Sequence, residues 1–85
     1  MTIPLNTAQK QLVETSMDLV PQMIRSMTRT SAYVSEEEQQ ELCQIGYLAL
    51  CRAAARFDKD RPFLPYARTL IRHAIFDYWR ETARD

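Results

Sequence analysis

The sequence is most informative between Glu41 and Asp58, where it reads ELCQIGYLALCRAAARFD. This composition favours a helix, because Ala, Leu, Gln, Glu and Arg dominate it. At 100° per residue, one side of the helix is apolar and suits a protein core; its members are Leu42, Gly46, Ala49, Leu50, Ala53 and Phe57. The opposite side is not polar, because it carries Tyr47, Leu48 and Cys51. We expect neighbouring helices to cover part of this second side and an external partner to meet the rest.

Signals on either side of this stretch predict two further helices. Ser35 is a good N-cap with Glu38 at the capping-box position, so the central helix is expected over 36–57. Apolar residues at helical spacing predict a first helix over 7–29, kinked at Pro21, after a frayed end at 1–6. A charged loop with two prolines precedes a third helix, expected over 65–84. The predicted fold class is all-α, a three-helix bundle or four pieces with the first helix kinked.

Length and composition limit the chain to one small domain. Its 85 residues include a single glycine, which argues against turn-rich all-β folds. The formal net charge is zero, but residues 1–50 carry −3 and residues 51–85 carry +3. Cys43 and Cys51 are too far apart on one helix for a disulfide, and one histidine cannot complete a zinc site. We therefore expect no metal and no cofactor, two free thiols and a cytoplasmic location, with neither signal peptide nor membrane span.

The third helix also has two informative sides. Its core stripe is apolar and consists of Ala67, Leu70, Ile71, Ala74, Ile75 and Tyr78. The far side mixes basic and aromatic residues with one threonine; its members are Tyr66, Arg68, Thr69, Arg72, His73, Phe76, Trp79 and Arg80. Guanidinium groups pair with phosphates and aromatic rings stack on unpaired bases, so this side suits nucleic acid. The alternative is a solvated helix whose large rings pack on loops.

Three segments in sequence order resemble a known family. ELCQIGYLALCRAAARFD resembles the second conserved region of bacterial RNA polymerase sigma factors, in which an acidic-Leu-x-Gln-x-Gly-x-x-x-Leu pattern leads into a Phe-Asp loop. RPFLPYARTLIRHAIFDYWR, at 61–80, resembles the next part of that region, and its IFDYWRE ending is most like the alternative, extracytoplasmic-function branch. LVETSMDLVPQMIRSM, at 12–27, resembles the helix that opens the region. The resemblance covers roughly residues 10–82 and implies one region 2 domain over 1–85.

The resemblance implies two binding surfaces and no catalytic group. The central helix would dock on the clamp helices of the largest polymerase subunit, through Glu41, Gln44, Tyr47, Leu48, Cys51 and Arg52. The following loop and third helix would bind the non-template strand of the minus-ten promoter element, through Arg61, Phe63, Tyr66, Arg68, Thr69, Arg72, His73 and Arg80. Within this set, Tyr66 would stack on an extruded base and the arginines would hold phosphates.

Two other functions stay open from the sequence. The chain resembles a region that is followed in the family by a second DNA-binding domain, which this sequence does not contain, so it is either a fragment or a one-domain relative. A one-domain relative could bind polymerase or an anti-sigma protein without DNA and act as a regulator. A three-helix reader of duplex DNA fits less well, because Phe76 and Trp79 are not base-reading side chains.

Overall fold

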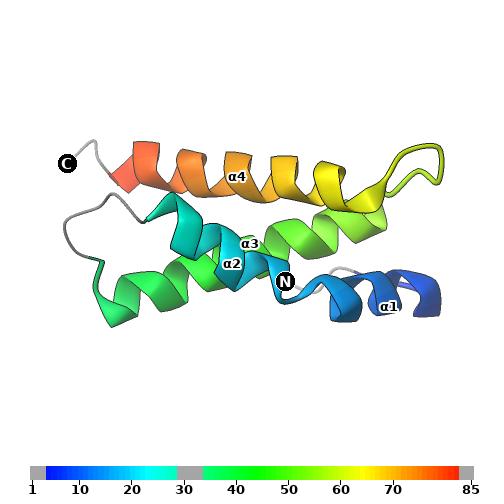
Figure 1. Cartoon of the computed structure of the whole chain (residues 1–85), viewed down its shortest axis with the longest axis horizontal. Coiled ribbons are helices and arrows are strands. Elements are labelled where there is room, and N and C mark those ends of the chain that lie inside the picture. Colours follow the sequence, from blue (N-terminus) through cyan, green and yellow to red (C-terminus); the bar gives the residue numbers. More distant parts are fainter. Residues whose placement is uncertain (1–3, 29–33, 83–85) are drawn as a thin grey trace.

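The structure is a computed structural model that describes residues 4–28 and 34–82. The described residues form four helices and no strand, which confirms the predicted all-α class. In chain order they are α1 (Thr7–Ser16), α2 (Leu19–Met27), α3 (Glu36–Ala55) and α4 (Phe63–Thr82) (Figure 1). None of these helices is both long and apolar enough to cross a membrane.

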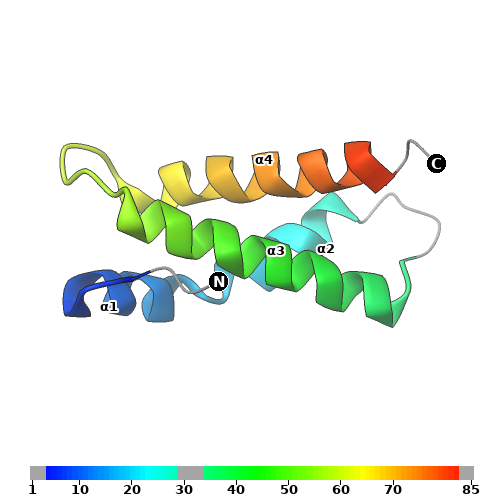
Figure 2. The same cartoon turned by 180° about the vertical axis from the view of Figure 1, so that it is seen from behind.

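Helix α3 is the centre of the bundle and contacts each of the other three helices. Helix α4 runs antiparallel to it over most of its length, and α1 lies along the C-terminal half of α3 (Figure 1). Helix α2 contacts both α3 and α4. From behind, α3 is the helix nearest the viewer, so one of its sides is not covered by another helix (Figure 2). The predicted central helix therefore has the exposed second side that its sequence indicated.

The first predicted helix is divided in two, but not at Pro21. The break lies at Met17 and Asp18, between α1 and α2, and Pro21 is the third residue of α2. The first four N–H groups of a helix have no partner within that helix, so a proline there costs no hydrogen bond. The next amide, that of Gln22, already donates to the carbonyl of Asp18 at 3.3 Å. The kink predicted at Pro21 is wrong for this reason, and the predicted end at Arg29 lies outside the described residues.

Both the first and the third helix of the structure begin at a side-chain cap. Ser35 caps α3, because its Oγ accepts from the Glu38 backbone N–H at 3.1 Å, as predicted. Asn6 caps α1 with a full capping box, in which Oδ1 accepts from the Gln9 N–H at 2.8 Å and Gln9 Oε1 accepts from the Asn6 N–H at 2.9 Å. Asn6 is therefore ordered, although we expected a frayed end through that residue; residues 1–3 lie outside the described part of the chain.

The loop between α3 and α4 differs from the predicted one by two residues at each end. Helix α3 ends at Ala55, and α4 begins at Phe63 with Pro65 as its third residue. Proline is again tolerated in the first turn. Residues 63, 67, 71 and 75 then form one row at a spacing of four, and all four are buried. The largest fully buried side chains of the bundle are Leu42, Leu50, Ile71, Ile75 and Val20.

Candidate functional site

The loop between α3 and α4 is a short, structured turn. The Asp58 carboxylate accepts from the Asp60 N–H at 3.1 Å, and the Asp58 carbonyl accepts from the Arg61 N–H at 3.1 Å. The two ends of the loop meet in an edge-to-face contact of Phe57 with Phe63, with ring centroids 5.2 Å apart. The loop tip is thus held at a fixed place beside the first turn of α4.

A small hollow lies where the loop meets α4. It has a volume of about 50 Å³ and is lined by Arg56, Phe57, Asp58, Arg61 and Tyr66. The Tyr66 ring is half-buried and packs on the core, while Arg61 is exposed. The fold therefore brings the predicted base-stacking ring beside one of the predicted phosphate-binding arginines.

Phe63 is the predicted DNA residue that does not reach the surface. Its side chain is 8% exposed and packs on Phe57 and the core. As the first residue of α4 it continues the buried row of Ala67, Ile71 and Ile75, so its ring belongs to the hydrophobic core. The structure thus places Phe63 inside the core, where its ring supports the loop, and not on the exposed side with the other predicted DNA residues.

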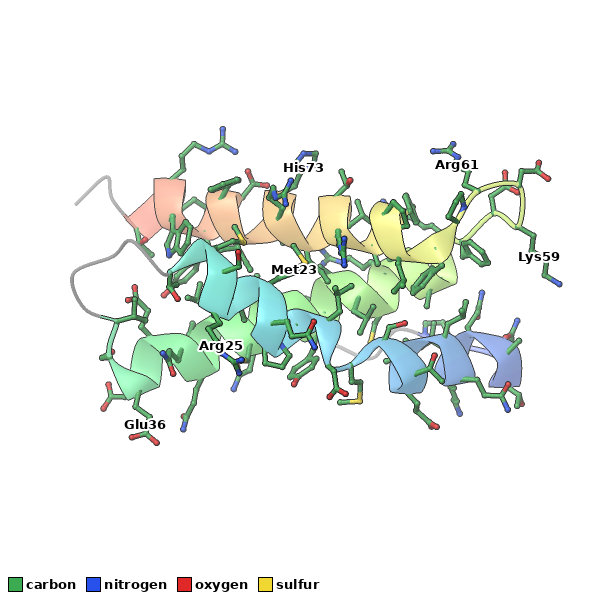
Figure 3. All side chains as sticks on the ribbon, in the orientation of Figure 1. Met23, Arg25, Glu36, Lys59, Arg61 and His73 are labelled. Atoms are coloured by element: carbon green, nitrogen blue, oxygen red, sulfur yellow. The ribbon has the colours of Figure 1, made fainter. Side chains whose placement is uncertain are left out.

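The outer side of α4 carries the remaining predicted DNA residues. Arg68, Thr69, Arg72 and His73 are exposed. His73 and Arg61 point away from the bundle on the same side (Figure 3). The Thr69 hydroxyl donates to the Pro65 carbonyl at 3.1 Å, which leaves its oxygen as an acceptor only. This side therefore presents four cationic or polar side chains from one continuous helix.

The C-terminal end of this side carries an ion pair and two large aromatic rings. The Arg80 guanidinium forms an exposed ion pair with Asp77, which neutralises one predicted phosphate ligand. Phe76 and Trp79 pack together with ring centroids 5.8 Å apart, and Phe76 is 48% exposed. Both rings line one shallow hollow with His73. The sequence placed them on the basic side of the helix, but we had not included them among the candidate site residues.

The uncovered side of α3 carries the predicted polymerase-contact residues. Four of them are exposed, namely Glu41, Gln44, Leu48 and Arg52. The Leu48 side chain is 40% exposed. Tyr47 and Cys51 are half-buried, and Tyr47 also packs on the core. The surface is thus an apolar centre of modest size with polar and charged residues around it.

Across residues 4–28 and 34–82, no three His, Cys, Asp or Glu side chains are grouped so that they could hold a metal ion. Cys43 and Cys51 are both free and half-buried.

Comparison with known proteins identifies a family for this chain. A family model described as Sigma-70 region 2 matches residues 12–85, which is most of the chain and includes both surfaces. Searches of curated proteins and of solved structures returned no match.

Proposed function

The chain belongs to the sigma-70 region 2 family, and on that premise we propose that it docks on RNA polymerase through α3 and holds an opened promoter strand on α4. Membership of the family gives the chain a role in transcription initiation, together with the RNA polymerase core and promoter DNA, as a non-enzymatic factor. The docking partner we propose is the pair of clamp helices in the largest polymerase subunit. The DNA we propose is the non-template strand of the minus-ten element.

The observation that carries this function is the placement of two different exposed surfaces on two helices. Leu48 lies exposed at the centre of the α3 surface, as a protein contact requires. Tyr66 lies beside Arg61 at the start of the α4 surface, where a ring and a cation suit one nucleotide. Since the two surfaces use different helices, both partners can be bound at the same time.

Binding of an opened strand is sufficient to favour promoter opening. Extruding a base costs a few kcal/mol, and stacking it on an aromatic ring returns about 1–3 kcal/mol. A protein that binds only the opened strand shifts the equilibrium towards it by this differential affinity. In the proposed complex Tyr66 stacks on the extruded base, while Arg61, Arg68 and Arg72 hold phosphates.

The test measures the two binding events separately, with core polymerase and a labelled single-stranded minus-ten oligonucleotide. Tyr66→Ala should weaken capture of the strand and leave polymerase docking unchanged, while Tyr66→Phe should retain both. The pair Gln44→Ala with Leu48→Glu should abolish polymerase docking. Leu64→Glu is the matched control for Leu48→Glu, because Leu64 is 48% exposed but lies on α4. Absence of polymerase binding by the wild-type chain at low salt would refute the proposal.

A second candidate function is regulation through protein contacts alone. The net charge of zero and the pairing of Arg80 with Asp77 both weaken the attraction for DNA. In this case α3 would bind polymerase or an anti-sigma protein without any DNA. Polymerase binding that is unchanged by the oligonucleotide and by Tyr66→Ala would favour this regulator over the promoter-binding factor.

A further inference from the structure

A groove lies between helices α2 and α4. Its α4 wall belongs to the proposed DNA surface, but its α2 wall belongs to neither proposed surface. The groove has a volume of about 260 Å³, and its lining residues are Leu19, Gln22, Met23, Ser26, Arg68 and Arg72. Leu19 and Met23 are buried and form an apolar floor, while the other four side chains are exposed. Figure 3 shows Met23 between the two helices. The groove thus has a nonpolar base and hydrogen-bonding walls.

The polar side chains come as two pairs, one on each wall. Gln22 and Ser26 are four residues apart on α2, and Arg68 and Arg72 are four residues apart on α4. Residues at this spacing lie on the same side of a helix, about 6 Å apart along its axis. Each wall therefore presents two hydrogen-bond donors in a row.

These donors are not used within the described part of the bundle. The ion pair found among residues 4–28 and 34–82 joins Arg80 to Asp77 and leaves Arg68 and Arg72 unpaired. None of the side-chain hydrogen bonds recorded for those residues involves any of the four polar side chains. No carboxylate lines the groove. Two fixed positive charges beside an amide and a hydroxyl are a suitable environment for an anion.

We propose that this groove binds a backbone phosphate of the nucleic-acid strand held on α4, and so extends the DNA interface onto α2. The guanidinium groups of Arg68 and Arg72 match the geometry of phosphate oxygens, and glutamine and serine are common additional donors to DNA phosphates. The ligand is a strand phosphate because the same two arginines belong to the α4 surface, so a strand on that surface passes the groove. This inference rests on the proposed function of α4.

Gln22→Glu is the most direct test, since it puts a negative charge into the groove. Its matched control is Gln39→Glu on α3, which makes the same chemical change at an exposed residue outside both proposed surfaces. The two glutamines also have the same helical position: the Gln22 amide donates to the Asp18 carbonyl, and the Gln39 amide donates to the Ser35 carbonyl. Both variants should fold, because a glutamate in the first turns of a helix suits the helix dipole.

The measurement is the affinity of each variant, in complex with core polymerase, for the labelled oligonucleotide at several salt concentrations. Gln22→Glu should lose roughly tenfold in affinity relative to Gln39→Glu, and Ser26→Glu should behave like Gln22→Glu. The slope of log affinity against log salt should become shallower by about 0.7 for the lost phosphate contact. Circular dichroism checks that the variants fold equally well.

A second oligonucleotide identifies the source of the phosphate. With neutral methylphosphonate linkages in place of the phosphodiesters, Gln22→Glu and Gln39→Glu should bind equally; a persistent difference would overturn the assignment to a strand phosphate. If Gln22→Glu and Gln39→Glu bind the natural oligonucleotide equally well, while capture by the wild-type protein still depends on Tyr66, the proposed phosphate site in the groove is refuted but the proposed function is not. Loss of all strand capture by the wild-type complex would instead refute the proposed function.

Discussion

Gly46 of α3 lies directly against Val20 of α2, so closely that a methyl group added to Gly46 would come within 2.6 Å of Val20 Cγ1. Val20 is fully buried, and a β-branched side chain in a helix has essentially one favoured rotamer. The valine cannot therefore turn aside. Gly46 is the point at which the sequence permits α2 and α3 to approach.

Gly46→Ala is expected to destabilise the domain, despite the higher helix propensity of alanine. Overpacking costs about 1–3 kcal/mol, and the gain in helix propensity offsets up to about 1 kcal/mol of it. We expect a net loss of about 1 kcal/mol in the free energy of unfolding, measured by urea denaturation. In a Val20→Ala background the same substitution should cost less, because the clashing methyl group is gone. An equal cost in both backgrounds would show that Val20 is not the obstacle.

Removing the cap of α3 should also lower stability. Ser35→Ala leaves the Glu38 N–H without its acceptor, and such a loss costs about 1 kcal/mol. Ser35→Asn should keep most of the stability, since the asparagine side chain also accepts from this amide. Thermal unfolding followed by circular dichroism measures both. Equal losses for the alanine and asparagine variants would mean that the cap contributes little.

The ion pair of Asp77 with Arg80 should matter more for DNA than for stability. Their side chains are 57% and 75% exposed, and such pairs contribute about 0–1 kcal/mol. Asp77→Asn should therefore leave the unfolding midpoint almost unchanged, while the freed Arg80 raises the affinity for a single strand at low salt. Glu81→Gln is the matched control, because it removes the same charge from an exposed neighbour outside the pair. If both variants gain affinity equally, the gain reflects net charge and not release of Arg80.

The rings of Phe57 and Phe63 are expected to be energetically coupled. Edge-to-face pairs contribute about 0.5–1.5 kcal/mol beyond the area they bury. A double-mutant cycle with Phe57→Leu and Phe63→Leu should give a coupling energy in this range. Additive effects of the two substitutions would show that the rings act independently and that the loop ends are not held by their contact.

The fold was largely predictable because local signals in the sequence agree with the packing. Ser35 correctly predicted where α3 begins, and the apolar row through Leu42 and Leu50 correctly predicted which side of α3 is buried. The break at Met17 and Asp18 was not predictable, because neither residue is a strong helix breaker; the visible breaker, Pro21, is harmless in a first turn. Asn6 could have been found as a cap, since a glutamine follows it at the capping-box position.

The candidate interface was predictable in outline and less so in detail. Placing the start of the last helix at Pro65 assigned Phe63 to an exposed loop, whereas its spacing of four from Ala67 shows that it continues the buried row. The pairing of Asp77 with Arg80 depends on the rotamers of the two side chains, which the helical spacing of residues in the sequence does not determine. The groove between α2 and α4 is formed by two helices that are distant in sequence. Nothing in the sequence around Gln22 and Ser26 therefore predicts that they lie beside Arg68 and Arg72.

The contact between Phe57 and Phe63 has a consequence for how such chains can diversify. Because the rings anchor both ends of the turn to the core, the five residues between them have little part in holding the bundle together. The side chains of Asp60 and Arg61 are exposed, so substituting them should change the free energy of unfolding little. Related chains can therefore change which ligand this turn prefers by substituting a few of its residues, without altering the helical bundle.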